Sequence, residues 1–181
     1  MESNFFLKGS SIGLRRLNTI DVAGNYDNWL NDPEITKYNS HGRFPISREN
    51  LNEYVINVNN SKNTLILAVI DIDSKLHIGN IGLQNINWID RNAEIAFLLG
   101  EKRFWGKGVM VEAGLILIRH GFNSLNLHRI YCGTSSQNIG MQKLALKLGM
   151  IQEGVRKEAI FKDNKYYDII EFGILKKNEI L

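Results

Sequence analysis

The segment EKRFWGKGVMVEAG, residues 101–114, joins a short basic turn to the start of an apolar helical pattern. Gly106 and Gly108 stand one residue apart in this turn, between basic side chains. Glycines between a strand and a helix let an anion approach the main chain, where unpaired amides and the dipole of the helix N-terminus favour negative charge. The stretch therefore predicts a phosphate-binding turn. These residues leave one alternative open, a tight turn with a solvated basic rim.

Two familiar phosphate motifs do not fit the turn. A Walker loop has Ser or Thr after its Gly-Lys pair, whereas Lys107 is followed here by Gly108. A dinucleotide-binding fingerprint has a third glycine where this chain has Val111, and it opens the first strand–helix unit of its domain. The predicted anion site belongs to neither class.

The turn lies within an alternation of strands and helices. Strand patterns occur at residues 12–18, 64–72, 77–89, 92–100, 127–135, 151–162 and 166–175. Helical patterns begin near Thr19, Ser47, Gly108 and Asn138 and end near Leu30, Val58, Phe122 and Gly149. Hairpins alternate with strand–helix–strand units, so we expect one α/β (α+β) domain over residues 1–181. Its central sheet should be mixed, mostly antiparallel, of about seven strands, with helices on both faces.

The composition favours a cytoplasmic globular domain. The chain has 181 residues, a net charge of +3 and one cysteine, which excludes an internal disulfide framework. Its start, MESNFFLKGSS, lacks a secretory pattern and its apolar runs are too short for a bilayer, so we expect a cytoplasmic location and no membrane partner. The basic residues are scattered, which argues against a nucleic-acid partner. The four histidines lack metal-ligand spacing, so no metal is expected.

Several ordered motifs resemble one family. RFWGKG, residues 103–108, matches the Arg/Gln-x-x-Gly-x-Gly/Ala signature of the GNAT superfamily of N-acetyltransferases. A Glu-bearing strand (AEIAFLLG) precedes it, FNSLNLHRIY follows it, and Asn138 opens a helix that ends in KLG. WLNDPEITKY, residues 29–38, is similar to the corresponding segment of the RimJ/RimL-type branch. The resemblance spans nearly the whole chain, is strongest over residues 77–150, and implies a GNAT-like fold.

The resemblance also implies that the turn binds the pyrophosphate of acetyl-CoA, the co-substrate of this superfamily. A bulged end of the preceding strand would leave main-chain amides at Leu98 and Leu99 free to pair with the pantetheine arm and, as an oxyanion hole, with the thioester carbonyl. Asn138 matches an asparagine near the cofactor arm; capping its own helix is an alternative and compatible role. The cofactor-binding residues implied in this way are Leu98, Leu99, Arg103, Phe104, Trp105, Gly106, Lys107, Gly108, Val109 and Asn138.

Glu94 matches the position of the base that is often proposed in the family. In direct acetyl transfer a neutral amine attacks the thioester, so a group must accept the amine's proton, often through water. Side-chain alternation puts Glu94 on one strand face with Ala96 and Leu98, and this face is expected to look toward the cofactor cleft. The alternative role is a structural ion pair, for example with Arg91 or Lys102.

The last helix departs from the family's pattern. Related enzymes often place a tyrosine or a serine there to protonate the departing thiolate, and those positions are Ala145 and Met141 in this chain. Neither side chain can donate a proton. Solvent, or a tyrosine of the last hairpin such as Tyr166 or Tyr167, is a substitute that the sequence does not establish.

Other chemistry-bearing residues are assigned to packing. Cys132 lies in a strand and is expected to be a small core residue rather than a nucleophile. Tyr26, Trp29, Tyr38 and Phe44 are candidates for an acceptor pocket, although aromatic residues at such positions more often pack in a core.

The predicted function is acetyl-CoA-dependent transfer of an acetyl group to a primary amine by direct attack on the thioester. The amine would belong to a small molecule, such as an amino-sugar nucleotide or a polyamine, or to a protein N-terminus. Mild basicity over residues 19–60 favours an amine attached to something anionic. The alternative is a catalytically degenerate module that binds or senses acetyl-CoA or CoA. The acceptor pocket is expected from the irregular segments 32–47 and 162–168, in a monomer or homodimer.

Overall fold

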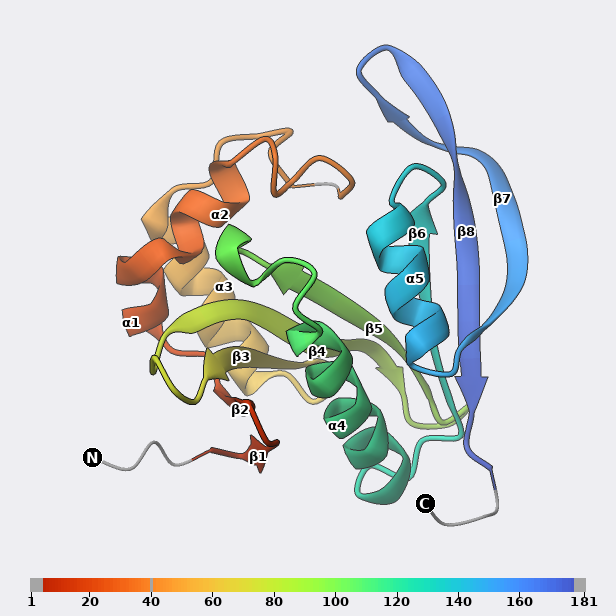
Figure 1. The fold of residues 1–181 in the computed structure, drawn as a ribbon, viewed down its shortest axis with the longest axis horizontal. Helices are drawn as coiled ribbons and strands as arrows, with labels where there is room; N and C mark the ends of the chain where they lie inside the picture. Colours follow the sequence, from red (N-terminus) through yellow and green to blue (C-terminus); the bar gives the residue numbers. More distant parts are fainter. Residues whose placement is uncertain (1–4, 40, 178–181) are drawn as a thin grey trace.

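The computed structural model describes residues 5–39 and 41–177 and contains one eight-stranded sheet (Figure 1). The strands lie in the order β1-β2-β3-β4-β5-β6-β8-β7. Neighbouring strands are antiparallel except for β5 and β6. Their bounds are β1 (Leu7–Lys8), β2 (Ile12–Arg16), β3 (Leu65–Asp71), β4 (His77–Asn87), β5 (Asn92–Leu99), β6 (Arg129–Ser135), β7 (Ile151–Lys162) and β8 (Lys165–Leu175).

The expected mixed, mostly antiparallel sheet with helices on both faces is confirmed, with one strand more than the seven patterns in the sequence. The additional strand is β1, which pairs with β2 through Leu7 and Lys8. A two-residue strand carries no readable periodicity, which is why the pattern missed it. The expected domain also includes residues 1–4, 40 and 178–181, which lie outside the described residues.

Helices cover both faces of the sheet (Figure 1). None of them, within the described ranges, is long and apolar enough to cross a bilayer. One face carries α1 (Thr19–Asp21), the π-helical turn η1 (Val22–Tyr26), α2 (Asp27–Asn31) and α3 (Arg48–Asn60), and the other carries α4 (Val109–Asn123) and α5 (Ile139–Lys147).

The first helical segment is not one continuous helix capped by Thr19, as the sequence suggested. Asn18 is the cap: its side chain accepts a hydrogen bond from the first turn at 3.1 Å, and the Asp21 carboxylate accepts from the Asn18 amide at 2.8 Å. At Gly24 the backbone leaves the helical region, with φ −81° and ψ −129°. This reciprocal cap holds the Asp21 side chain inward, where it is 6% exposed.

Two apolar cores lie on opposite sides of the sheet, and β3 contributes to both. Its residues alternate, with Leu67 and Val69 under α4 and with Ile66, Ala68 and Ile70 under α1 to α3. The continuous apolar run of β3 therefore reflects burial on both faces, as expected from the sequence.

The sheet opens between β5 and β6. These two strands pair only through Asn92–Glu94 and Arg129–Tyr131. Beyond Glu94, β5 continues beside β4 to Leu99, while β6 continues beside β8. The facing edges of β5 and β6 therefore part in a V, and α4 begins near its wide end (Figure 1).

The β7–β8 hairpin reaches the loop between α2 and α3. Lys162 Nζ donates to the Thr36 carbonyl at 2.7 Å, and Arg43 Nη2 donates to the Phe161 carbonyl at 3.2 Å. The tip of the hairpin and the irregular segment before α3, far apart in sequence, therefore lie against each other.

Candidate functional site

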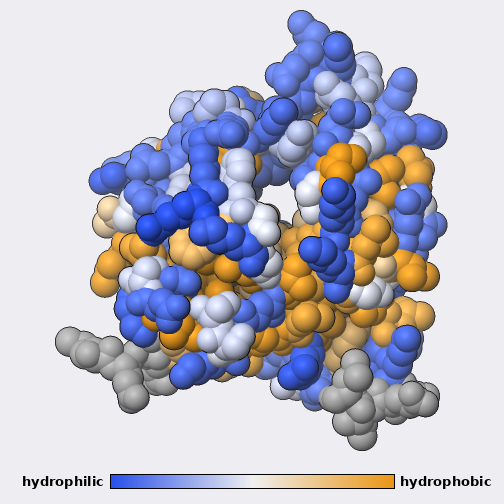
Figure 2. Space-filling model, viewed as in Figure 1, coloured by the Kyte–Doolittle hydropathy of each residue, from blue (hydrophilic) through white to orange (hydrophobic). Residues whose placement is uncertain are grey.

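The wide end of the V between β5 and β6 is the candidate site. Figure 2 shows an opening here, between the end of β5 with its following turn on one side and α5 with β6 on the other. Phe97 and Leu99 of β5 are partly buried and pack against the core under α4. The opening gives a ligand access to the unpaired edge of β5.

The main chain of Leu99 faces this opening. The Gly100 amide donates to the Ile78 carbonyl on β4 at 3.0 Å. Because N–H groups alternate between the two edges of a strand, the amide and carbonyl of Leu99 point away from β4, toward the opening. The Trp105 indole agrees with this direction, since its Nε1 donates to the Leu99 carbonyl at 3.0 Å. By the same alternation the Leu98 amide faces β4, so of the two expected residues Leu99 offers its amide to the opening.

The expected bulge lies one residue beyond Leu99. The amides of Gly100 and Glu101 both donate to the Ile78 carbonyl, each at 3.0 Å. Two residues opposite one partner are the mark of a β-bulge, which here turns the chain out of the sheet into the 3₁₀ turn η2 (Lys102–Phe104). A Cβ on Gly100 would lie 1.9 Å from the Trp29 ring, so only glycine fits at this bend.

The glycine turn has the geometry that an anion cradle needs. Gly106 and Gly108 have φ of 73° and 81°, and a Cβ built on either would meet no atom within 4 Å. Gly108 is the N-cap of α4 and has no side chain to occupy the first amides. Within the described residues, the amides of Gly106, Gly108 and Val109 have no backbone acceptor. The turn thus presents donors without backbone acceptors and open space at both glycine Cα atoms, a fit for a diphosphate at a helix N-terminus.

The basic side chains around the turn are not equivalent. Lys102 Nζ is 2.8 Å from an Asp32 carboxylate oxygen and contacts a second carboxylate, and these contacts raise the pKa of Lys102. Arg103 and Lys107 lie 5.2 Å and 5.5 Å from the Phe104 ring centroid. Lys102 is therefore engaged in ion pairs, Arg103 Nε lies 3.8 Å from a Glu101 carboxylate oxygen, and Lys107 has no ion pair among the described residues.

Glu94 stands where β5 and β6 begin to part. It is the last residue of β5 to pair with β6, opposite Tyr131, and Gln84 of β4 lies beside it. Its carboxylate accepts a hydrogen bond from Asn85 Nδ2 at 3.1 Å. Glu94, Tyr131 and Glu171 line one polar hollow, and burial together with the Glu94 charge raises the pKa of Tyr131.

The alternative ion pairs of Glu94 are not formed. Arg91 donates to Asn126 at 2.8 Å, and Lys102 is paired with Asp32 as described above. The Glu94 carboxylate therefore has an amide partner rather than a cationic one.

The short helix α5 matches its predicted details. Asn138 caps it, with Oδ1 accepting from the Met141 amide at 3.1 Å. Ala145 is fully buried and Met141 packs against the same core. The structure thus confirms the capping role of Asn138; the position of the missing tyrosine lies in the core, and that of the missing serine is partly buried against it.

A cavity of about 310 Å³ lies between the sheet and the helices α2 and α3. Ala96 and Leu98 of β5 form part of its wall, on the strand whose edge borders the opening. Tyr26, an expected candidate, lines it together with residues that the sequence analysis missed: Asn50, Tyr54, Asn80 and Gln84. Asn80 carried a readable signal, because a carboxamide in a strand covered on both faces needs a partner.

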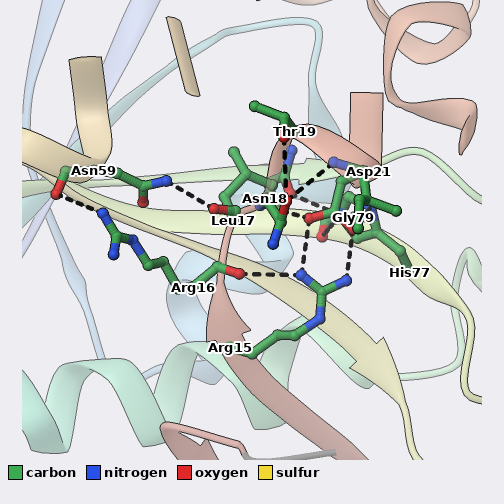
Figure 3. Close-up of polar contacts among 11 residues, drawn as sticks. Arg15, Arg16, Leu17, Asn18, Thr19, Asp21, Asn59, His77 and Gly79 are labelled. Carbon is green, nitrogen blue, oxygen red and sulfur yellow. Dashed lines mark hydrogen bonds and ion pairs between the residues drawn. The ribbon is translucent and has the colours of Figure 1, made fainter. Parts of the chain in front are cut away.

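A network of Arg15, Asp21 and His77 lies at the start of β4, beside this cavity (Figure 3). Arg15 donates to both carboxylate oxygens of Asp21, at 2.8 and 2.5 Å. Burial by itself would raise the pKa of Asp21, but the hydrogen bonds from Arg15 and Asn18 and the nearby His77 outweigh it, so the pKa is lowered. His77 Nδ1 lies 3.5 Å from Asp21, and the Trp29 ring packs against the imidazole at a centroid distance of 4.9 Å.

The remaining candidates have structural surroundings. Burial raises the pKa of the Cys132 thiol to about 12, as suits a core cysteine, which confirms its assignment. Trp29 packs in the core under α1 to α3, whereas Phe44 is 81% exposed. Within the described residues, no group of three or more His, Cys, Asp or Glu side chains could hold a metal ion.

Comparison with known proteins points in one direction. The sequence profile of the acetyltransferase (GNAT) domain matches residues 11–151. The uncharacterized N-acetyltransferase p20 of Bacillus licheniformis is 32% identical over 165 residues, 89% of each chain. The ribosomal-protein-serine acetyltransferase of Escherichia coli (strain K12) is 33% identical over 92 residues, 51% of each chain. The crystal structure of spermidine N-acetyltransferase from Vibrio cholerae in complex with CoA and spermine aligns with a TM-score of 0.84 and 27% identity, covering 92% of this chain and 96% of that one.

Proposed function

The chain belongs to the GNAT acetyltransferase family, and on that premise we propose that it is an acetyl-CoA-dependent N-acetyltransferase acting on a primary amine. The observation that carries the proposal is the turn at Gly106 and Gly108, with its left-handed glycines, open space and free amides at the start of α4. These features suit the pyrophosphate of acetyl-CoA. The adjacent opening between β5 and β6 suits the pantetheine arm.

The residues divide the work of binding and catalysis. Main-chain groups from Arg103 to Val109 hold the pyrophosphate, with the charges of Arg103 and Lys107 beside it. Leu99 donates its amide to the acetyl oxygen as negative charge develops there, and Leu98 keeps this strand end paired to β4. Asn138, already engaged in capping α5, borders the cofactor arm.

Glu94 accepts the proton that the attacking amine gives up, through water. The amine nitrogen bonds to the acetyl carbon, the carbon–sulfur bond breaks, and the electron pair of that bond leaves with the sulfur. Ala145 and Met141 offer no acid for the thiolate, and Tyr166 is 62% exposed on the hairpin. We assign protonation of the thiolate to solvent, since a thiolate is a stable leaving group.

The finer parts of the assignment belong to this proposal as well. We propose one domain in the cytoplasm, as a monomer or homodimer, with an amine-bearing small molecule or peptide rather than nucleic acid as its partner. Similarity to the ribosomal-protein-serine acetyltransferase supports the RimJ/RimL-like branch. The alternative, a degenerate module that senses acetyl-CoA or CoA without turnover, is favoured by the side chains at 141 and 145.

The decisive experiment measures transfer and binding separately. Thiol release from acetyl-CoA is followed over a panel of amines, amino-sugar nucleotides and peptides, with mass spectrometry of the products, and calorimetry measures acetyl-CoA affinity. Acetylated amine together with thiol release is the expected result. Tight acetyl-CoA binding without transfer to any amine would support the sensor, and absence of binding would overturn both readings.

A further inference from the structure

The cavity under α2 and α3 carries an inference about the acceptor, which rests on the proposed function. Ala96 and Leu98 of β5 line the cavity, whereas Phe97 and Leu99 pack under α4. The cavity therefore lies on the face of β5 opposite α4, beside the strand that would present the acetyl group. An amine that enters from this side can approach the end of β5 without crossing the cofactor opening. What lines the cavity therefore selects the body of the acceptor.

The orientation of the Asn80 amide follows from its neighbours. His77 Nε2 lies 3.0 Å from the Gly79 carbonyl and 2.8 Å from Asn80 Oδ1. A carbonyl oxygen can only accept, so Nε2 must carry a hydrogen, and Asn80 must present its oxygen to that hydrogen. The Asn80 amide nitrogen is therefore turned away from His77. Asn80 is 5% exposed, and this nitrogen has no hydrogen-bond partner among the described residues.

The imidazole that orients Asn80 is itself held in place. The rings of Trp29 and Tyr26 pack edge-on against His77, at centroid distances of 4.9 and 6.2 Å. Burial lowers the pKa of His77, and the Asp21 carboxylate offsets this only in part, so the ring is neutral near physiological pH. A fixed neutral imidazole keeps the Asn80 donor turned away from His77, on a residue that lines the cavity. The Tyr26 phenol lies beside the Asn80 side chain, whose polar contact partly offsets the rise in the pKa of Tyr26, but the geometry between the phenol and Nδ2 is not that of a hydrogen bond.

The cavity wall carries no fixed charge: burial lowers the pKa of His41, the imidazole that lines it among the described residues. No Asp, Glu, Lys or Arg of the described residues lines it. Burial raises the pKa values of Tyr26 and Tyr54, so both phenols stay neutral. Carboxylates on α2 and in the loop after it are engaged elsewhere: Asp27 with Arg48 at 2.5 Å, and Asp32 with Lys102 at 2.8 Å.

We infer that the acceptor is a primary amine on an uncharged, partly apolar body whose carbonyl or hydroxyl oxygen accepts a hydrogen bond from Asn80 Nδ2. A buried donor left unpaired is unfavourable, so a ligand oxygen there gains affinity. A second ammonium group within the cavity, as in a polyamine, would lose its hydration without a carboxylate in the cavity wall, and a phosphate would find no cation in that wall. The acceptor class thus differs from the polyamine named for the Vibrio cholerae relative and from the amino-sugar nucleotide that the sequence favoured.

The test uses probes of matched length at saturating acetyl-CoA: 6-amino-1-hexanol, hexylamine and 1,6-diaminohexane, with spermidine and glucosamine 6-phosphate as charged comparisons. We expect kcat/KM for the amino alcohol to exceed that for the diamine, spermidine and the phosphate by tenfold or more. It should also exceed that for hexylamine by about tenfold, the effect of one hydrogen bond. A higher kcat/KM for any of the charged probes would overturn the inference.

Variants of Asn80 tie the preference to this side chain. Asn80→Ala should remove the advantage of the amino alcohol over hexylamine, and Asn80→Asp, of the same size, should shift the preference toward the diamine. Asn123→Asp adds the same charge on α4, under the opposite face, and should leave the ranking unchanged; acetyl-CoA affinity and thermal melting verify that each variant folds. Equal loss for all probes in the Asn80 variants would refute the assignment.

The inference and the proposed function can fail separately. Calorimetric binding of the same probes to the protein saturated with CoA reports the ranking without turnover. If no amine is acetylated but the amino alcohol binds more tightly than the diamine, the transferase proposal fails and the cavity chemistry stands. If transfer occurs but the diamine is the better substrate and ligand, the inference about the cavity fails and the transferase proposal stands.

Discussion

Replacement of Gly106 by Glu, compared with Gln at the same position, tests the anion cradle directly. Both side chains have nearly the same volume and enter the same open space, since no atom lies within 4 Å of a Cβ at this position. Both also force a non-glycine residue to adopt φ of 73°, which costs about 1–2 kcal/mol of stability in either variant. The two variants therefore differ in charge alone.

The magnitude follows from Coulomb's law. At a separation of about 6 Å, one carboxylate and one phosphate charge repel by about 0.7 kcal/mol in water and by about 2.8 kcal/mol at an effective dielectric constant of about 20. Two phosphate charges double this to about 1.4–5.5 kcal/mol, so the Glu variant should bind acetyl-CoA about 10-fold to 10,000-fold more weakly than the Gln variant.

Calorimetric titration with acetyl-CoA measures the difference, and thermal melting verifies that the two variants are equally stable. The difference should shrink when ionic strength rises from about 0.1 M to about 1 M, because the screening length falls from about 10 Å to about 3 Å. Wild-type affinity in both variants would remove the turn from the binding site. Equal weakening in both at every salt concentration would mean that bulk alone acts there, and the electrostatic reasoning would be refuted.

Three further outcomes are expected. Glu94→Gln should lower kcat by about 100-fold or more with acetyl-CoA affinity nearly unchanged, whereas Glu171→Gln, in the same hollow, should not; equal activity of both would remove Glu94 from the mechanism. Gly100→Ala should lower the free energy of unfolding by about 1–3 kcal/mol in urea titrations, because its Cβ would lie 1.9 Å from the buried Trp29 ring; an unchanged midpoint would contradict the packing. Asp21→Asn should lower it by about 2–3 kcal/mol at neutral pH. Burial by itself would raise the folded pKa of Asp21, but hydrogen bonding holds it below the unfolded value of about 3.9. The stability that ionised Asp21 contributes is therefore complete above about pH 3.9 and is lost as pH falls through the folded pKa. A stability difference between wild type and Asp21→Asn that stays constant down to about pH 2 would be inconsistent with this.

The local part of the site could be predicted, and its distant partners could not. Gly106 and Gly108 mark the turn through backbone freedom alone, and Asn138 marks the start of α5 through the amide that it caps. The ion pair of Lys102 with Asp32 could not be predicted, because the sequence does not show which of the many carboxylates folding will bring close to a surface lysine. The same holds for Glu94, whose predicted ionic partners bond elsewhere.

The sequence by itself determined the elements and the anion-binding turn of this protein, because strand period, helix period, caps and glycine turns depend on residues that are neighbours along the chain. Only the tertiary structure decided that β5 and β6 separate beyond Glu94, that Leu99 presents its amide to the opening, and that His77 orients the amide of Asn80 in the wall of a cavity without fixed charge. These features arise from strand pairing and from contacts between residues far apart in sequence. A side chain's face can be read from periodicity, whereas its neighbour on the adjoining element is known only once the sheet has assembled.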